Sequence, residues 1–156
     1  MIEEIKNHPK GWLSLRDCKG IFHRFREDVT FDQPIPPFET REPGKLEGIL
    51  GSVSQTFDGK YLNSTVLDAT SAYFNQLIKG HAFLNGNKRL AVLYTHFFLL
   101  MNNLDFKFSF HELWFIALQV AILAERGWSS KKTLKIIKKM FGDNIVKRKP
   151  SKLSAT

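Results

Sequence analysis

The 156-residue chain is long enough to bury a hydrophobic core, and its 43% hydrophobic and 13% aromatic residues exclude an intrinsically disordered protein. A formal net charge of +8 would suggest a nucleic-acid-binding protein if it were spread over the chain. Residues 129–156, however, hold nine basic residues and one acidic residue, whereas residues 1–128 hold 14 of each. We therefore expect a solvated helix face and a basic tail, with contact to RNA or another acidic partner as the alternative.

Three features bear on the cellular compartment. Cys18 is the single cysteine, so the chain cannot form an internal disulfide. The N-terminus carries Glu3 and Glu4 and lacks the basic and apolar regions of a signal peptide. The mainly apolar stretch from Leu90 to Met101 is 12 residues long, which is too short to span a bilayer. We expect a cytoplasmic protein that makes no contact with a membrane.

Apolar residues recur at helical spacing in six segments, and no long segment alternates as a half-buried strand would. Capping motifs such as Ser109 to Glu112 mark helix starts, and Gly80 and Gly127 mark two helix ends. Asp58-Gly59 predicts a tight turn or a hairpin with two residues on each side. The sequence thus predicts an all-α fold with helices near residues 15–27, 45–55, 64–79, 88–102, 110–126 and 130–141.

Residues 30–45 contain four of the six prolines. Proline fixes φ and removes an N–H donor, so this segment is predicted to be irregular. A loop of this length inside a compact domain is commonly functional or mobile, and composition leaves open a passive connector and a flap that faces a substrate.

Around these segments we predict a flexible N-terminus (1–11), one helical domain (12–142) and a basic disordered tail (143–156). The helix near residues 88–102 is apolar on nearly every side, which places it in the middle of the domain. The helix near residues 110–126 is almost as apolar, so the two helices are expected to pack on each other.

The nine residues from His81 to Arg89 place a histidine, two asparagines, a glycine and two cations directly ahead of the central helix. A helix N-terminus attracts anions, and Gly86 lets the backbone approach one closely. Lys88 and Arg89 oppose the helix dipole, a cost that a bound polyphosphate would offset. His81 can take a proton near neutral pH, and Phe83 is placed to hold the loop in the core. On this physics alone, a phosphate site and a purely structural loop both remain open.

The pattern His-x-Phe-x-Asn-Gly-Asn-Lys-Arg over residues 81–89 resembles the signature of the Fic/Doc superfamily. Lys88 matches the Doc (death-on-curing) toxin branch, where the AMP-transferring Fic branch has glycine. Residues 42–51, 77–80 and 124–127 also resemble Doc segments, so the resemblance covers roughly residues 12–142. It implies an all-α, Fic/Doc-like domain of about six helices, with the motif loop between two central helices.

For Doc-like members, the resemblance implies transfer of the γ-phosphoryl group of ATP, with Mg²⁺, to a protein hydroxyl. The implied target is translation elongation factor Tu, and the implied consequence is arrested translation. By position, His81 is the general base, and the phosphate-binding residues are Gly86, Asn87, Lys88 and Arg89. The alternatives are a Fic-type AMP transferase and a non-catalytic binding module of the same family.

The chain departs from the family pattern at two positions. Asn85 stands where an Asp or Glu usually helps to hold Mg²⁺; an amide oxygen can ligate the metal but brings no charge, so weaker metal binding is expected. Val92 stands where the Fic branch has a second arginine, which favours the Doc-like reaction. The self-inhibitory motif of the family is absent from the sequence, so inhibition is expected from a separate antitoxin chain.

Overall fold

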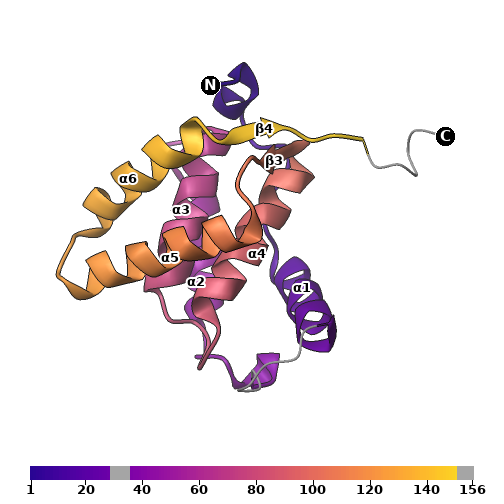
Figure 1. Cartoon of the computed structure of the whole chain (residues 1–156), viewed down its shortest axis with the longest axis vertical. Coiled ribbons are helices and arrows are strands. Elements are labelled where there is room, and N and C mark those ends of the chain that lie inside the picture. Colours follow the sequence, from indigo (N-terminus) through magenta and orange to yellow (C-terminus); the bar gives the residue numbers. More distant parts are fainter. Residues whose placement is uncertain (29–35, 151–156) are drawn as a thin grey trace.

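The structure, a computed structural model, describes residues 1–28 and 36–150. Six α-helices make up most of these residues, so the predicted all-α fold is confirmed (Figure 1). The helices are α1 (Leu15–Asp28), α2 (Lys45–Ser54), α3 (Val66–Lys79), α4 (Asn87–Met101), α5 (Phe110–Glu125) and α6 (Ser130–Gly142). The short elements are the 3₁₀ helices η1 (Glu3–Lys6) and η2 (Phe38–Thr40) and the strands β1 (Thr56–Phe57), β2 (Lys60–Tyr61), β3 (Leu104–Phe106) and β4 (Ile145–Lys147).

Side-chain caps explain where several helices begin. At α1, the Ser14 hydroxyl accepts from the Asp17 N–H and the Asp17 carboxylate accepts from the Ser14 N–H, both at 3.0 Å. Ser109 and Glu112 form the same reciprocal pair at α5. Helix α3 starts slightly later than predicted because the Thr65 hydroxyl caps it. Each cap satisfies an N–H group that the helix cannot, which is worth about 1 kcal/mol.

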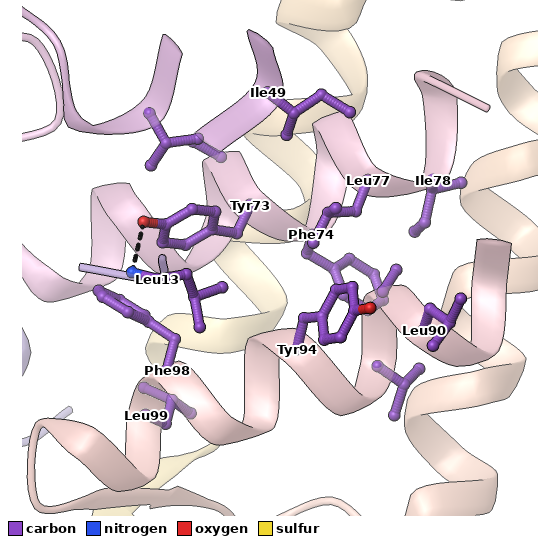
Figure 2. Close-up of a cluster of buried hydrophobic side chains, with 14 of the residues drawn as sticks. Leu13, Ile49, Tyr73, Phe74, Leu77, Ile78, Leu90, Tyr94, Phe98 and Leu99 are labelled. Carbon is purple, nitrogen blue, oxygen red and sulfur yellow. Dashed lines mark hydrogen bonds between the residues drawn. The ribbon is translucent and has the colours of Figure 1, made fainter. Parts of the chain in front are cut away.

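Helices α3 and α4 lie side by side in the middle of the domain, which agrees with the central position predicted for α4 (Figures 1 and 2). Tyr73 of α3 packs edge-on against Phe98 of α4, with ring centroids 4.9 Å apart. The Tyr73 hydroxyl accepts from the backbone N–H of Leu13 at 3.1 Å (Figure 2), and the Tyr94 hydroxyl donates to the carbonyl of Cys18 at 3.0 Å. These two buried hydrogen bonds fix the start of α1 to the central pair.

Helix α5 packs on α3 and α4, as expected for an apolar helix, but it is an outer helix rather than a core one (Figure 1). Phe115 and Ile122, on its outward side, are 58% and 45% exposed. The apolar residues of α5 are therefore only partly buried, because only one side of the helix faces the central pair. Within the described residues, no helix combines the length and apolar character that crossing a membrane requires.

Described residues near both ends of the chain pack against the domain, in segments predicted to be flexible or disordered. Ile5, in the segment expected to be flexible, is fully buried, and the carbonyl of Asn7 accepts from the Val66 N–H at 2.8 Å. The tail predicted to be disordered from residue 143 instead begins with β4, which pairs antiparallel with β3. This strand forms because Ile145 is buried against the core and because β3 has an edge with which it can pair. Residues 151–156 lie outside the described part of the chain.

The hairpin expected around Asp58-Gly59 forms, with two residues in each strand.

Ile49 of α2 packs against Gly80, the last residue before the motif loop. A Cβ at Gly80 would lie 2.6 Å from Ile49 Cδ1 and 2.7 Å from the carbonyl oxygen of Gln76. Gly80 thus ends α3 as predicted and also lets α2 approach the loop closely.

Candidate active site

The motif loop, residues 81–86, connects the end of α3 to the start of α4. Its two ends both have positive φ, 47° at His81 and 82° at Gly86. Glycine adopts this conformation without strain, and histidine adopts it more readily than bulky or β-branched residues do. Gly86 is the N-cap residue of α4, so no cap side chain covers the N–H groups of the first turn. The N–H groups of Asn87 and Lys88 are therefore available to an anion.

Phe83 holds the loop to the core. Its side chain is 7% exposed and stacks on Phe22 of α1, with ring centroids 5.6 Å apart and ring planes 17° apart. It also packs against Phe38 of η2 and Tyr94 of α4, at centroid separations of 5.9 and 6.3 Å. Three separate elements therefore meet at one loop side chain, and this explains how a polar loop is held in one conformation.

The side chain of Asn87 braces the same loop. Its Oδ1 accepts from the Phe83 N–H at 2.9 Å, and its Nδ2 donates to the Phe83 carbonyl at 2.8 Å. Asn85 makes a shorter-range contact, in which its Oδ1 accepts from the Gly86 N–H at 2.7 Å. The sequence predicts ligand-binding roles for both asparagines; what the structure shows is that both side chains stabilise the turn.

The segment before α2 contacts the loop from another side. The Glu42 N–H donates to the carbonyl of Ala82 at 2.8 Å. Arg41 donates to Glu47 of α2 at 2.7 Å and lies over the Phe38 ring at 4.2 Å. This donation from Arg41 holds the pKa of Glu47 below its ordinary value. The described part of the proline-rich segment is thus fastened to the loop; residues 30–35 lie outside the described residues.

A pocket of about 470 Å³ opens beside the loop. It is lined by Ile78, Lys79, His81, Leu84, Asn85, Gly86, Asn87, Lys88, Ala121, Ala124 and Glu125. Five of the predicted site residues therefore meet in one pocket: His81, Asn85, Gly86, Asn87 and Lys88. Phe83 lies in the core behind the loop, and Arg89, in the first turn of α4, is not among the lining residues.

A comparison with models of known families matches residues 12–99 to the Fic/DOC family. The match covers more than half of the chain and includes the whole motif loop. The chain belongs to the Fic/DOC family. Members of this family are generally NTP-dependent transferases. Neither the curated proteins nor the solved structures contain a match to this chain.

In this member of the Fic/DOC family, the matched residues supply α1 to α3, the motif loop and most of α4. The remaining wall of the pocket comes from α5, outside the match, through Ala121, Ala124 and Glu125. Sequence reasoning missed Glu125 and also Lys79. Both lie in segments that resemble Doc segments, residues 77–80 and 124–127, and that resemblance was the signal that could have assigned them to the site.

Charge in this Fic/DOC pocket is mainly positive. Lys79 and Lys88 line it together with His81 and the N-terminus of α4, and Glu125 is the one carboxylate among the lining residues. Lys79 Nζ lies 3.5 Å from the carbonyl oxygen of Trp128, a contact that holds the side chain towards the turn between α5 and α6. Fixed cations and helix N–H groups around a concave site favour a polyanionic ligand such as a triphosphate.

Proposed function

We propose that this protein is a Doc-like toxin that transfers the γ-phosphoryl group of a nucleoside triphosphate such as ATP to a protein hydroxyl. The observation that carries the proposal is the exposed His81 in one pocket with Lys88 and the glycine-capped N-terminus of α4. An anion site next to a potential base is the minimum that phosphoryl transfer to a hydroxyl requires.

In the proposed reaction, His81 takes the proton of the target hydroxyl while that oxygen bonds to the γ-phosphorus. The bond from the γ-phosphorus to the β–γ bridging oxygen breaks, and the nucleoside diphosphate leaves. The Gly86 backbone and Lys88 bind and neutralise the phosphates, which supplies most of the catalysis in reactions of this type. Asn87 acts indirectly by bracing Phe83, and Arg89 adds positive charge to the first turn of α4.

Mg²⁺ is proposed as the cofactor that accompanies the nucleotide. The Asn85 Oδ1 atom accepts one hydrogen bond, from Gly86, and an amide oxygen has a second lone pair for a metal ion. The pocket also contains one carboxylate, and Mg²⁺ bound with a nucleotide commonly uses one or two carboxylates besides the phosphates and water. The donor set therefore fits. When bound, Mg²⁺ neutralises charge on the phosphates.

The proposed target is elongation factor Tu, so the proposed consequence is arrested translation in the cytoplasm. Inhibition by a separate antitoxin chain is part of the same proposal. Fic-type AMP transfer has less support, because Val92, at the position of the second Fic arginine, is 1% exposed and packs in the core. A non-catalytic binding module is the remaining alternative.

The decisive experiment incubates the purified protein with a cell lysate and ATP labelled at either the α or the γ phosphate. Transfer of label to protein from the γ position only is expected. Transfer from the α position only would replace the proposal with AMP transfer. Tight nucleotide binding without transfer from either position would favour a binding module. Growth arrest on expression, lost in His81→Ala, is the matching result in cells, and unchanged toxicity in that variant would remove His81 from the mechanism.

A further inference from the structure

We propose that Glu125 supplies the carboxylate that holds the nucleotide-bound Mg²⁺, compensating for the neutral amide of Asn85. The proposal rests on the function proposed above. It assigns a specific role to a residue of α5, which lies outside the family match and distant in sequence from the motif.

Glu125 is positioned for this role by the helix that carries it. It is the last residue of α5. The same pocket is lined by Ala121, four residues earlier, and by Ala124, one residue earlier. Residues four apart lie on one face of a helix, so the pocket-facing side of α5 ends in this carboxylate. The two alanines are small and add little bulk to the pocket that Glu125 shares with the Asn85–Lys88 loop.

The carboxylate of Glu125 has no partner in the part of the chain that the structure describes. It makes no hydrogen bond or ion pair with any side chain in residues 1–28 and 36–150, although Lys79, His81 and Lys88 line the same pocket. Some other surface carboxylates on the described chain do have partners, as Glu4 does with Lys147 at 3.0 Å. An exposed acid without a partner in a cationic pocket is available to a ligand.

Electrostatics then restricts what that ligand can be. A bare carboxylate repels the phosphates that the rest of the pocket attracts, and so weakens binding of a metal-free triphosphate. A divalent cation between the carboxylate and the phosphates reverses the sign of this interaction. Among the described residues no three His, Cys, Asp or Glu side chains form a group able to hold a metal ion. Metal binding therefore depends on the nucleotide phosphates, with Asn85 and Glu125 as the oxygen donors from the protein.

The test measures nucleotide binding, not activity. ATP affinity is determined by calorimetry over a Mg²⁺ titration and also in EDTA, for the wild type and Glu125→Gln. The control is Glu3→Gln, which removes the same charge from an 85% exposed side chain in η1. In Glu125→Gln the Mg²⁺ concentration at half-maximal binding should rise about tenfold, whereas ATP affinity in EDTA should stay equal or increase. Glu3→Gln should follow the wild type. Adding Asn85→Asp to Glu125→Gln should restore the Mg²⁺ response.

Other results overturn the proposal. Equal losses of affinity with Mg²⁺ and in EDTA would mean that Glu125 contacts hydrogen-bond donors of the nucleoside. An unchanged Mg²⁺ midpoint in Glu125→Gln would mean that it is a bystander. If the wild type binds ATP tightly and Glu125→Gln gives either of these results, only this inference is refuted. A wild type that binds no ATP under any condition refutes the proposed function as well.

Discussion

The side chain of Asn87 is joined to the backbone of Phe83 by two hydrogen bonds, one accepted at 2.9 Å and one donated at 2.8 Å. Asn87 is the first residue of α4, and Phe83 is the loop residue buried against α1 and η2. The pair therefore closes the loop on itself and connects its buried anchor to the helix end at the pocket. An asparagine that sequence comparison would assign to phosphate binding is also the main brace of the loop.

This pair predicts that Asn87→Ala lowers stability as well as nucleotide binding. The change leaves the N–H and carbonyl of Phe83 without partners, which should reduce the free energy of unfolding by about 1–3 kcal/mol. Asn87→Asp keeps the acceptor and loses the donor, so an intermediate loss is expected. Urea denaturation of the three proteins measures the effect. Full stability in Asn87→Ala, combined with weaker nucleotide binding, would show that the residue is only a ligand contact.

His81 is expected to matter for chemistry and not for folding. Its side chain is exposed, and in His81→Asn the new residue tolerates the backbone φ of 47° at this position. The rate of phosphoryl transfer should fall about 10²- to 10⁴-fold, the usual contribution of a general base. The thermal midpoint and ATP affinity should stay close to those of the wild type. A large drop in ATP affinity would instead make His81 a binding residue.

For Asn85→Asp, we expect tighter Mg²⁺ binding and equal or higher activity. In the wild type the Gly86 N–H donates to the amide oxygen of Asn85 at 2.7 Å. A carboxylate oxygen can accept the same hydrogen bond, so the loop should keep its conformation. The added negative charge strengthens the contact with a divalent cation. The Mg²⁺ dependence of ATP binding and of transfer reports both effects. If the Mg²⁺ dependence does not change, Asn85 is not a metal ligand.

The ion pair between Arg41 and Glu47 predicts how stability responds to acid. The pKa of Glu47 is lowered because Arg41 donates to its carboxylate. A lowered pKa means that the ion pair stabilises the fold above the ordinary carboxyl pKa of 4.5 and that this contribution disappears as the pH falls through the lowered value.

Thermal midpoints of the wild type and Glu47→Gln should therefore differ at neutral pH and converge in acid. The Glu47 side chain is 40% exposed, so the corresponding difference in the free energy of unfolding should stay below about 1 kcal/mol. It should shrink further in high salt. Glu3→Gln, which disrupts an exposed contact with Lys6 at 3.6 Å, is the matched control and should show little difference. A gap that persists at the lowest pH would mean that Glu47 stabilises the protein through packing and not charge.

Much of the fold could be predicted because its signals are local. The capping boxes at Ser14 and Ser109 and the apolar periodicity of the helices depend on residues a few positions apart. The strand β4 could not be predicted in this way. Ile145 and Val146 favour a strand, but three residues are too few to show an alternating pattern, and pairing with β3 becomes possible only once α6 brings Ile145 beside Phe106.

The sequence by itself determined the helices, the motif loop and the chemical character of its residues, because helix caps, turn glycines and the dipole of α4 act over a few neighbouring positions. Tertiary structure alone decided what surrounds that loop. The bond from Glu42 to Ala82, the stack of Phe83 on Phe22 and the approach of Glu125 to the pocket each join segments far apart in the chain. Such contacts follow from how α1, α2 and α5 pack around α3 and α4, and local patterns carry no record of that packing.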